Sequence, residues 1–289
     1  MARRVLTSAL DRLYREFDRV DSAADPIHIV RRYRHGADRE IAGFCAAGLA
    51  FGRVSGLMAS IERLLACMGP HPAAFVRAFD PSRDGASLVQ LVHRWTRGTD
   101  FVALLWILRQ MLEQSGTIEE YFLHGLHPAD PDVGPAIESF SRRARAIDLQ
   151  PAYGRRATGP AAGSPGVHFF FPRPSTGSAC KRLNLFLRWM VRHDEVDLGV
   201  WSRVPPSKLV VPLDTHIARV GRCLRLTRHK SPGWTMAAEI TASLRRLDPH
   251  DPVRYDFALC HVGMHGWCGF GRARGDHACP LRGLCRPAG

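Results

Sequence analysis

The chain is organised around residues 177–220, which read GSACKRLNLFLRWMVRHDEVDLGVWSRVPPSKLVVPLDTHIARV. Ser178 is a good N-cap, and Leu183 and Leu187 follow it at helical spacing, so a helix is predicted here. Lys181 falls in the first turn of that helix, where the positive end of the helix dipole disfavours the ammonium form. A neutral lysine amine is a nucleophile that can form a Schiff base.

A second polar residue, Asp214, stands at the start of the next clear helix. It follows the apolar residues 210–213, and Ile217 and Val220 lie on one face of the run after it. Asp214 is therefore predicted to be an N-cap whose carboxylate can also face a cleft. Taken alone, such an aspartate is more typical of a helix cap than of a catalyst.

The lysine content of the chain gives Lys181 more weight. Of the 40 Lys and Arg residues only Lys181, Lys208 and Lys230 are lysines, which leaves 40 − 3 = 37 arginines. A lone lysine is usually a solvated charge or a phosphate contact. However, arginine cannot supply a neutral primary amine, so a lysine in this segment indicates amine chemistry.

The charge of the chain predicts a polyanionic partner. The 289 residues carry a formal net charge of +13, with a sequence pI of about 10.1, which favours nucleic acid ahead of an anionic membrane. No apolar run approaches the roughly 20 residues that span a bilayer. The first 17 residues form an amphipathic pattern without the apolar core of a signal peptide. We expect a monomeric cytoplasmic protein associated with the nucleoid.

The residue pattern predicts an all-α fold with two helical subdomains, because strands have support at most over residues 209–211. The predicted division is an N-terminal helical subdomain over 1–150, a Gly/Pro-rich loop over 151–176, a catalytic helical subdomain over 177–259 and a cysteine-rich tail over 260–289. Within the first part, one short helix is predicted over 86–96. The Phe169–Phe171 triplet of the loop is predicted to pack in a core.

The tail is the second informative region. Cys260, Cys268, Cys279 and Cys285 fall in the last thirty residues with histidines between them, and clustered cysteines in a cytosolic protein are more often metal ligands than disulfides. Cys260 lies among apolar residues and is predicted to be core, which leaves three thiolates. Zinc would accept His277 or His265 as a fourth ligand, whereas an iron–sulfur cluster normally takes four cysteines. The other four cysteines, among them Cys223, are interpreted as structural.

The motifs of the 177–220 segment carry a resemblance to a known superfamily. GSACKRLN resembles the helix-hairpin-helix of the endonuclease III superfamily of DNA glycosylases, whose hairpin reads roughly LPGVGRKTAN. By this likeness Gly177 matches the first hairpin glycine, Lys181 the catalytic lysine and Asn184 the asparagine after it. PLDTHIARV is similar to the superfamily's VDTHVxRV segment, which puts Asp214 on the catalytic aspartate.

Two departures refine the resemblance. Ala179 replaces the second hairpin glycine, and Lys181 and Asp214 are 33 positions apart, an interval similar to that of the archaeal AGOG-type 8-oxoguanine DNA glycosylases. The KRLNLFLRWMVR…PPSKL…PLDTH signature also resembles a family of uncharacterised bacterial proteins.

The tail motif CPLRGLC resembles the end of the iron–sulfur loop of endonuclease III and MutY-type enzymes, whose pattern is C-x6-C-x2-C-x5-C. Cys268, Cys279 and Cys285 would take the first, third and fourth ligand places, and His277 stands beside the place of the second. The resemblance implies a [4Fe-4S] cluster, with zinc as the alternative cofactor.

The resemblance further implies excision of an oxidised purine, with 8-oxoguanine the first candidate, from double-stranded DNA, and strand cleavage through a Schiff base. The base would be flipped into a cleft between the helical subdomains. The residues expected to contact DNA are Gly177, Ser178, Ala179, Arg182, Lys208 and His216. Two other classes stay open, namely a non-catalytic DNA-binding or repair-scaffold module and an RNA-directed protein.

Overall fold

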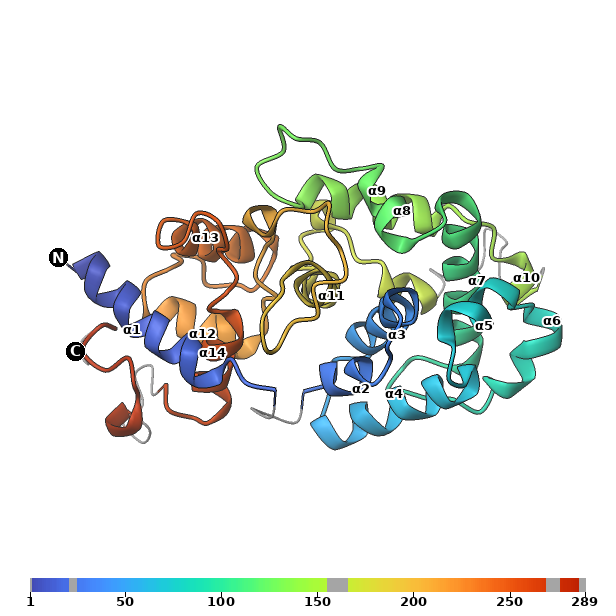
Figure 1. The fold of residues 1–289 in the computed structure, drawn as a ribbon, viewed down its shortest axis with the longest axis horizontal. Coiled ribbons are helices and arrows are strands. Elements are labelled where there is room, and N and C mark those ends of the chain that lie inside the picture. The colour runs from blue at the N-terminus through green and yellow to red at the C-terminus, as the bar shows by residue number, and fades with distance from the viewer. Residues whose placement is uncertain (1, 21–24, 155–165, 269–275, 286–289) are drawn as a thin grey trace. The chain divides into compact units, whose positions relative to one another are not determined.

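Helices are the only extended regular elements in the part of the chain that the structure describes (Figure 1). The computed structural model describes residues 2–20, 25–154, 166–268 and 276–285. Isolated bridges pair His93 with Thr96 and His193 with Leu198, and no other β pairing occurs in these ranges. The predicted all-α class is therefore confirmed for the described residues. None of their helices is both long and apolar enough to cross a membrane.

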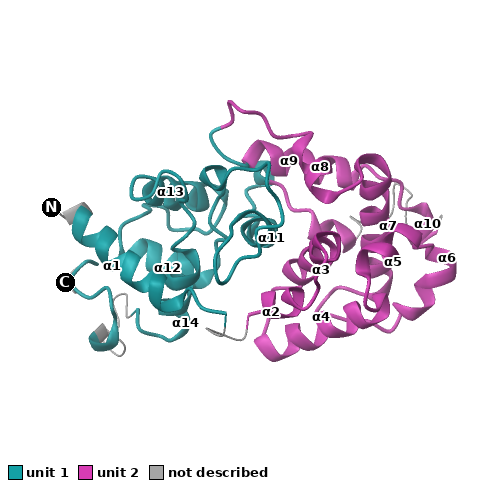
Figure 2. Ribbon diagram, in the orientation of Figure 1, with its two compact units in different colours: residues 1–23, 131–133, 174–289 teal, residues 24–130, 134–173 magenta. Residues whose placement is uncertain are grey.

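The chain forms two compact units, coloured separately in Figure 2. Unit 1 comprises residues 1–23, 131–133 and 174–289, and unit 2 comprises 24–130 and 134–173. This division differs from the predicted boundary at residue 150, because the N-terminal helix α1 (Ala2–Phe17) belongs with the C-terminal part of the chain. Its amphipathic pattern predicts a buried face but does not specify which helices cover that face.

Unit 2 contains nine α-helices and two short 3-10 helices in its described residues. They are α2 (Ile27–Arg31), α3 (Gly36–Gly48), α4 (Val54–Met68), α5 (Pro72–Ala78), α6 (Pro81–Asp84), α7 (Gly98–Ser115), α8 (Ile118–Leu123), α9 (Gly134–Arg145) and α10 (Gln150–Tyr153), with η1 (Gly85–Ser87) and η3 (Gly166–Phe170). The longest, α7, is largely buried; at its start the Asp100 carboxylate accepts the Arg97 backbone N–H at 2.8 Å, and at its end the C-cap is Gly116, whose φ is +79°.

The helix predicted over 86–96 is wrong. After η1 the chain makes turns, and His93 and Thr96 exchange backbone hydrogen bonds of 3.0 and 2.9 Å around Arg94, whose φ of +58° no α-helix accepts. The buried His93 ring lies 3.0 Å from Ser60 Oγ and 3.1 Å from the Phe51 carbonyl oxygen. These tertiary contacts override the local helical pattern.

An aromatic core holds unit 2 together. The rings of Phe44, Phe140 and Phe171 lie 5.6–6.1 Å apart, and Phe170 and Phe171 are fully buried. Gly48 lies so close to Phe170 that a Cβ atom would come within 2.8 Å of its ring. The predicted packing role of the phenylalanine triplet is confirmed for Phe170 and Phe171, and the small residues of α3 permit this close approach.

Unit 1 is built from α1 and four later helices. These are α11 (Lys181–Val191), α12 (Thr215–Cys223), α13 (Trp234–Arg245) and α14 (Asp256–Met264), with the 3-10 helices η4 (Pro174–Thr176), η5 (Pro206–Lys208) and η6 (Asp276–Ala278). Helix α12 packs closely on α14, because a Cβ atom at Gly263 would lie 2.6 Å from that of His216. The Phe17 ring of α1 lies 5.3 Å from the His261 ring of α14.

Candidate active site

Lys181 is the first residue of α11, as the sequence predicts, but the start of the helix is built differently. The N-cap is Cys180, in the left-handed conformation with φ +49°, and its carbonyl accepts the Asn184 N–H at 2.9 Å. Ser178 is not the N-cap, so that prediction is wrong. Its Oγ instead accepts the Cys180 N–H at 3.2 Å, within the loop before the helix. Ser178 therefore lies in the loop that precedes the N-cap residue Cys180.

Hydrogen bonds hold the hairpin-like loop, residues 177–180, at both of its ends. Gly177 has φ +79°, and its carbonyl oxygen accepts the N–H of Trp234, the first residue of α13, at 3.3 Å. At the other end, Asn184 Nδ2 donates to the Ala179 carbonyl at 3.1 Å. The left-handed residues are Gly177 and Cys180, so Ala179 occupies the second glycine position without the positive φ that favours glycine.

Asp214 caps α12, which confirms the predicted N-cap. Its Oδ1 accepts the backbone N–H groups of His216 at 2.9 Å and Ile217 at 2.7 Å. Its Oδ2 accepts a hydrogen bond of 3.3 Å from the thiol of Cys260, in α14. Three donors therefore hold the carboxylate in one orientation at the positive end of the helix.

Cys260 links the two candidate catalytic residues. Burial, and next the nearby Asp214 carboxylate, raise the pKa of the Cys260 thiol, while the charge of Lys181 opposes them. The thiol thus lies within electrostatic range of both Lys181 and Asp214. Cys260 was predicted to be a core residue; it is partly buried, and its thiol points to a carboxylate. No local sequence pattern indicates this role, because the contact depends on how α14 packs against α12.

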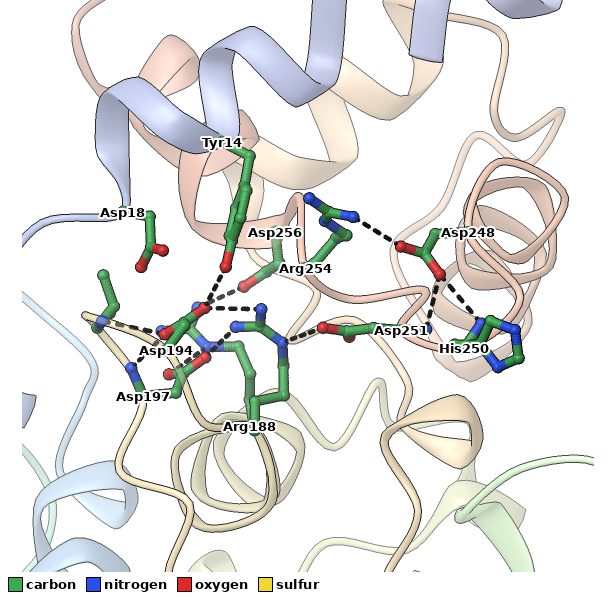
Figure 3. Close-up of polar contacts among 12 residues, drawn as sticks. Tyr14, Asp18, Arg188, Asp194, Asp197, Asp248, His250, Asp251, Arg254 and Asp256 are labelled. Carbon is green, nitrogen blue, oxygen red and sulfur yellow. Dashed lines mark hydrogen bonds and ion pairs between the residues drawn. The ribbon is translucent and has the colours of Figure 1, made fainter. Parts of the chain in front are cut away.

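A buried ion-pair network anchors the helix that carries Lys181 (Figure 3). Arg188, two turns further along α11, places Nε 3.1 Å from Asp197 Oδ1 and an Nη atom 2.6 Å from Asp256 Oδ2. All three side chains are at least 96% buried. Because Asp256 is the first residue of α14, the network fixes the start of the Cys260 helix to α11.

Arg192 extends this network to α1. It pairs with Asp197, with Asp194 at 2.7 Å and with Asp251 at 2.8 Å, and the Tyr14 hydroxyl donates to Asp194 at 3.1 Å. Burial raises the pKa of Asp197 and of Asp256 to about 6, although the Arg188 guanidinium acts in the opposite direction on both. The residues around Arg188 and Arg192 in the sequence have the spacing of an amphipathic helix, and this spacing does not indicate the ion pairs of the network.

The expected DNA contacts lie at three places in unit 1. Ser178 and Ala179 are in the hairpin-like loop, and Arg182 follows Lys181 in α11, where burial lowers its pKa to about 10. Lys208 ends η5, and its carbonyl accepts the Val133 N–H at 2.9 Å. His216 lies in the first turn of α12, against Gly263. In the sequence, Gly177 precedes Lys181 and His216 follows Asp214, whereas Lys208 is held through its carbonyl contact with Val133.

The cysteine-rich tail is described except for residues 269–275 and 286–289. Cys268 and Cys279 are buried, Cys285 is partly buried, and His277 is exposed. The neighbouring Cys268 thiol, followed by burial, raises the pKa of the Cys223 thiol at the end of α12, and the Cys285 thiol acts in the same direction.

A zinc ion or an iron–sulfur cluster takes thiolate ligands, and the set expected from the resemblance is Cys268, Cys279 and Cys285 with His277. Within the described ranges, no group of three or more His, Cys, Asp or Glu side chains could hold a metal ion.

Residues 25–265 match the model of the family described as "Protein of unknown function (DUF2400)". The match includes Lys181, Asp214 and Cys260, whereas Cys268, Cys279 and Cys285 follow it. No curated protein and no solved structure matches the chain.

Proposed function

This chain belongs to the DUF2400 family, and we propose that it is a bifunctional DNA glycosylase that removes an oxidised purine and cleaves the strand. The proposal includes a helix-hairpin-helix formed by the loop at residues 177–180 and helix α11, and a cleft that admits the flipped base. The most suitable substrate is 8-oxoguanine in double-stranded DNA, as the resemblance to AGOG-type enzymes implies.

One observation carries the proposal. Lys181 and Asp214, which are 33 positions apart in the sequence, stand at the first turns of two different helices and both act on the Cys260 thiol. A primary amine and a carboxylate held in one orientation are the two groups that amine-based glycosidic cleavage requires. The buried Arg188 network supports this arrangement, because it fixes α11 to the helix that carries Cys260.

The proposed reaction begins when the Lys181 Nζ lone pair forms a bond to C1′ of the sugar. The C1′–N bond to the base breaks, and its electron pair leaves with the base, which takes up a proton. Asp214 stabilises the positive charge that develops on the sugar and accepts a proton from the amine. Opening of the sugar ring leaves a Schiff base, and loss of a C2′ proton then expels the 3′ phosphate and cleaves the strand.

The test uses a panel of duplexes that each carry one lesion, scored for base release, strand cleavage and borohydride trapping. Lys181→Gln should abolish trapping and base release while DNA binding is kept. Lys230→Gln, a change of an exposed lysine, is the matched control and should react as the wild-type protein does, whereas Lys208→Gln should weaken DNA binding and keep trapping. An adduct that persists in Lys181→Gln and disappears in Lys208→Gln would mean that the wrong lysine has been chosen.

Asp214→Asn tests the second residue. Base release should slow by orders of magnitude, because a neutral amide cannot stabilise a cationic sugar. The amide oxygen can still cap α12, so the stability loss should be no more than about 1 kcal/mol. Thr117→Ala, which removes the Oγ1 cap of α8 at Glu120 N–H, is a control of similar cost that should leave base release unchanged.

Binding provides an independent check. With 40 Lys and Arg against 27 Asp and Glu, the affinity for duplex should fall log-linearly with salt, with a slope that reflects several phosphate contacts. Affinity that is flat across salt would remove the nucleic-acid proposal. Steep salt dependence with no reaction on any lesion would favour a non-catalytic DNA-binding module, and tighter binding to structured RNA would favour an RNA-directed protein.

A further inference from the structure

We propose that Trp95 in unit 2 is a stacking platform for an unpaired base of a DNA strand, and that exposed arginines beside it contact the phosphates of the same strand. The proposal rests on the DNA-binding part of the proposed function, and it does not depend on Lys181 or on the glycosylase reaction. It adds a binding site in unit 2, whereas every residue expected from the sequence to contact DNA lies in unit 1.

Trp95 and its apolar neighbours are exposed. The exposed fraction of Trp95 is 57%, although tryptophan is usually well buried. Two segments, residues 51–54 and 89–97, form what we call the Trp95 surface. They contain four of the seven exposed large apolar side chains of the described residues, which are Val54, Val89, Val92 and Trp95. Exposed apolar side chains that are grouped in this way mark an interaction surface.

Ring contacts hold the Trp95 indole in place. It stacks on the Phe51 ring, with the ring centroids 5.0 Å apart and the planes 28° from parallel. The Phe169 ring makes edge contacts with both, at 5.1 Å from Trp95 and 4.9 Å from Phe51. The indole is therefore supported by two aromatic side chains, while more than half of the residue stays exposed. Because the ring is already held, a base that stacks on it does not have to immobilise it.

The backbone that carries Trp95 is also fixed. His93 and Thr96 exchange two hydrogen bonds, which leaves the two residues between them at the tip of a tight turn. The first of these, Arg94, has φ +58°, a conformation that Gly, Asn or Asp usually takes in such turns. Strain of this kind is concentrated at binding and catalytic sites. The buried His93 ring anchors the turn, with Nε2 3.1 Å from the Phe51 carbonyl oxygen.

The Trp95 surface is positively charged. Arg53, Arg94 and Arg97 are exposed, and the two segments contain no Asp or Glu. The Arg94 side chain lies beside Gly52, where a Cβ atom would be 3.7 Å from Arg94 Nε. An exposed aromatic ring among arginines is the combination that binds single-stranded nucleic acid, because the ring stacks on any base while the arginines neutralise phosphates.

A second copy of the chain is the competing occupant of an exposed apolar surface. Two such surfaces face to face would bring arginines together without a carboxylate between them, and like charges across an interface cost free energy. The next carboxylate along the chain, Asp100, is buried and accepts the Arg97 N–H at 2.8 Å. The surface therefore favours an anionic partner with flat rings, and a DNA strand with unpaired bases has both properties.

The experiment measures binding of the full chain to a fluorescein-labelled oligodeoxyadenylate and to an abasic strand of the same length. Trp95→Ala should weaken binding of the oligodeoxyadenylate by about 5- to 150-fold, the range for loss of one stacked base. The abasic strand keeps its phosphates but has no ring to stack, so its affinity should not change. Trp95→Phe should keep most of the affinity, and Val89→Ala, a change of an exposed side chain without a ring, should leave it unchanged.

Arg94→Gln tests the phosphate contact. It should weaken binding of both strands and lower the slope of log affinity against log salt by about 0.7. Equal losses for the two strands in Trp95→Ala, or no loss for either, would overturn the proposal. A dimer in sedimentation that Trp95→Ala abolishes would overturn it in favour of a second copy of the chain.

Tryptophan fluorescence keeps the proposal testable if Trp95→Ala does not fold. Saturating oligodeoxyadenylate should quench part of the wild-type emission, and this quenching should be absent in Trp95→Phe; quenching that persists there would contradict the platform. Base release from a lesion-bearing duplex separates this proposal from the reaction. Strand binding that depends on Trp95 in a protein that releases no base supports the platform and contradicts the glycosylase. Base release with strand affinity indifferent to Trp95 does the reverse.

Discussion

The two units bury their charged side chains for different purposes. In unit 1, Arg188 and Arg192 lie among four aspartates, and the network joins α11 to α14 and α1. In unit 2 the buried carboxylates of α3 accept backbone N–H groups instead: Asp38 accepts that of Ala73, and Glu40 accepts those of Ile118 and Glu119. In unit 2 the buried carboxylates therefore accept the unpaired N–H groups at helix N-termini, whereas in unit 1 the buried ion pairs orient the helix that carries Lys181.

The largest stability effect is expected from Arg188→Met. This change leaves Asp256 without its close partner in a buried site, and removal of one member of a buried ion pair costs about 3–5 kcal/mol. Arg32→Met, which breaks an exposed pair with Glu62 in unit 2, should cost at most about 1 kcal/mol. Hydrogen exchange read separately at α11 and α7 measures both, and equal losses would contradict the contrast between the units.

The pH dependence should also differ between the units. The folded-state pKa values of Asp197 and Asp256, about 6, lie above the ordinary value of 3.8, so their contribution is fully present below about pH 4. That contribution is lost as the pH rises through about 6. Each carboxyl should therefore make unit 1 more stable by up to about 1.4 kcal/mol per pH unit as the pH falls between these limits.

Asp256→Asn isolates one of these two groups. Because the amide stays neutral, the slope of the unfolding free energy against pH should be smaller than in the wild-type protein by the contribution of about one bound proton. Protection of α11 and α7 measured at pH 5 and pH 7 gives both slopes. A wild-type unit 1 that weakens on acidification as much as the variant does would refute the assignment.

In unit 2, Glu40→Gln should have a smaller effect. The amide retains one acceptor oxygen for the two N–H groups at the start of α8, so one buried donor loses its partner at a cost of about 1–3 kcal/mol. The unfolding midpoint in urea measures this change.

The smallest effect is expected from Arg143→Lys in α9. The Arg143 guanidinium lies 4.0 Å from the centroid of the Tyr121 ring and donates to the Tyr121 carbonyl oxygen, and burial lowers its pKa. Lysine loses the planar stacking, which should cost about 0.5–1 kcal/mol. The neighbouring exposed Arg142→Lys is the control and should leave the urea midpoint unchanged. An equal shift in both would show that the contact with Tyr121 contributes nothing.

The sequence predicted those features that depend on neighbouring residues. The helical class, the Asp214 cap and the position of Lys181 in a first turn follow from spacing and capping, which are local. The features that it missed depend on tertiary contacts. Ser178 fits an N-cap as well as any serine does, but the left-handed Cys180 moves the start of the helix.

The same reason explains the missed members of the site. Cys260 lies among apolar residues and Cys223 is a single cysteine between Arg222 and Leu224, so the sequence alone assigns each of them a structural role. Only the packing of α14 on α12 brings the Cys260 thiol to Asp214, and only the path of the tail brings two further thiols to Cys223. Likewise, nothing near Arg188 indicates that its partners lie at Asp197 and Asp256.

The membership of α1 in unit 1 has a consequence for synthesis on the ribosome. The Tyr14 hydroxyl donates to Asp194, and Asp11 accepts a hydrogen bond of 2.7 Å from the Tyr255 hydroxyl. Helix α1 is therefore synthesised first, but its partners are synthesised near the end of the chain. Nearly all of unit 2 is translated in between and can fold as a unit while α1 is still without its partners. We therefore expect pulse-labelled nascent chains to protect α7 well before α11, with unit 1 closing only after residue 255 has left the exit tunnel.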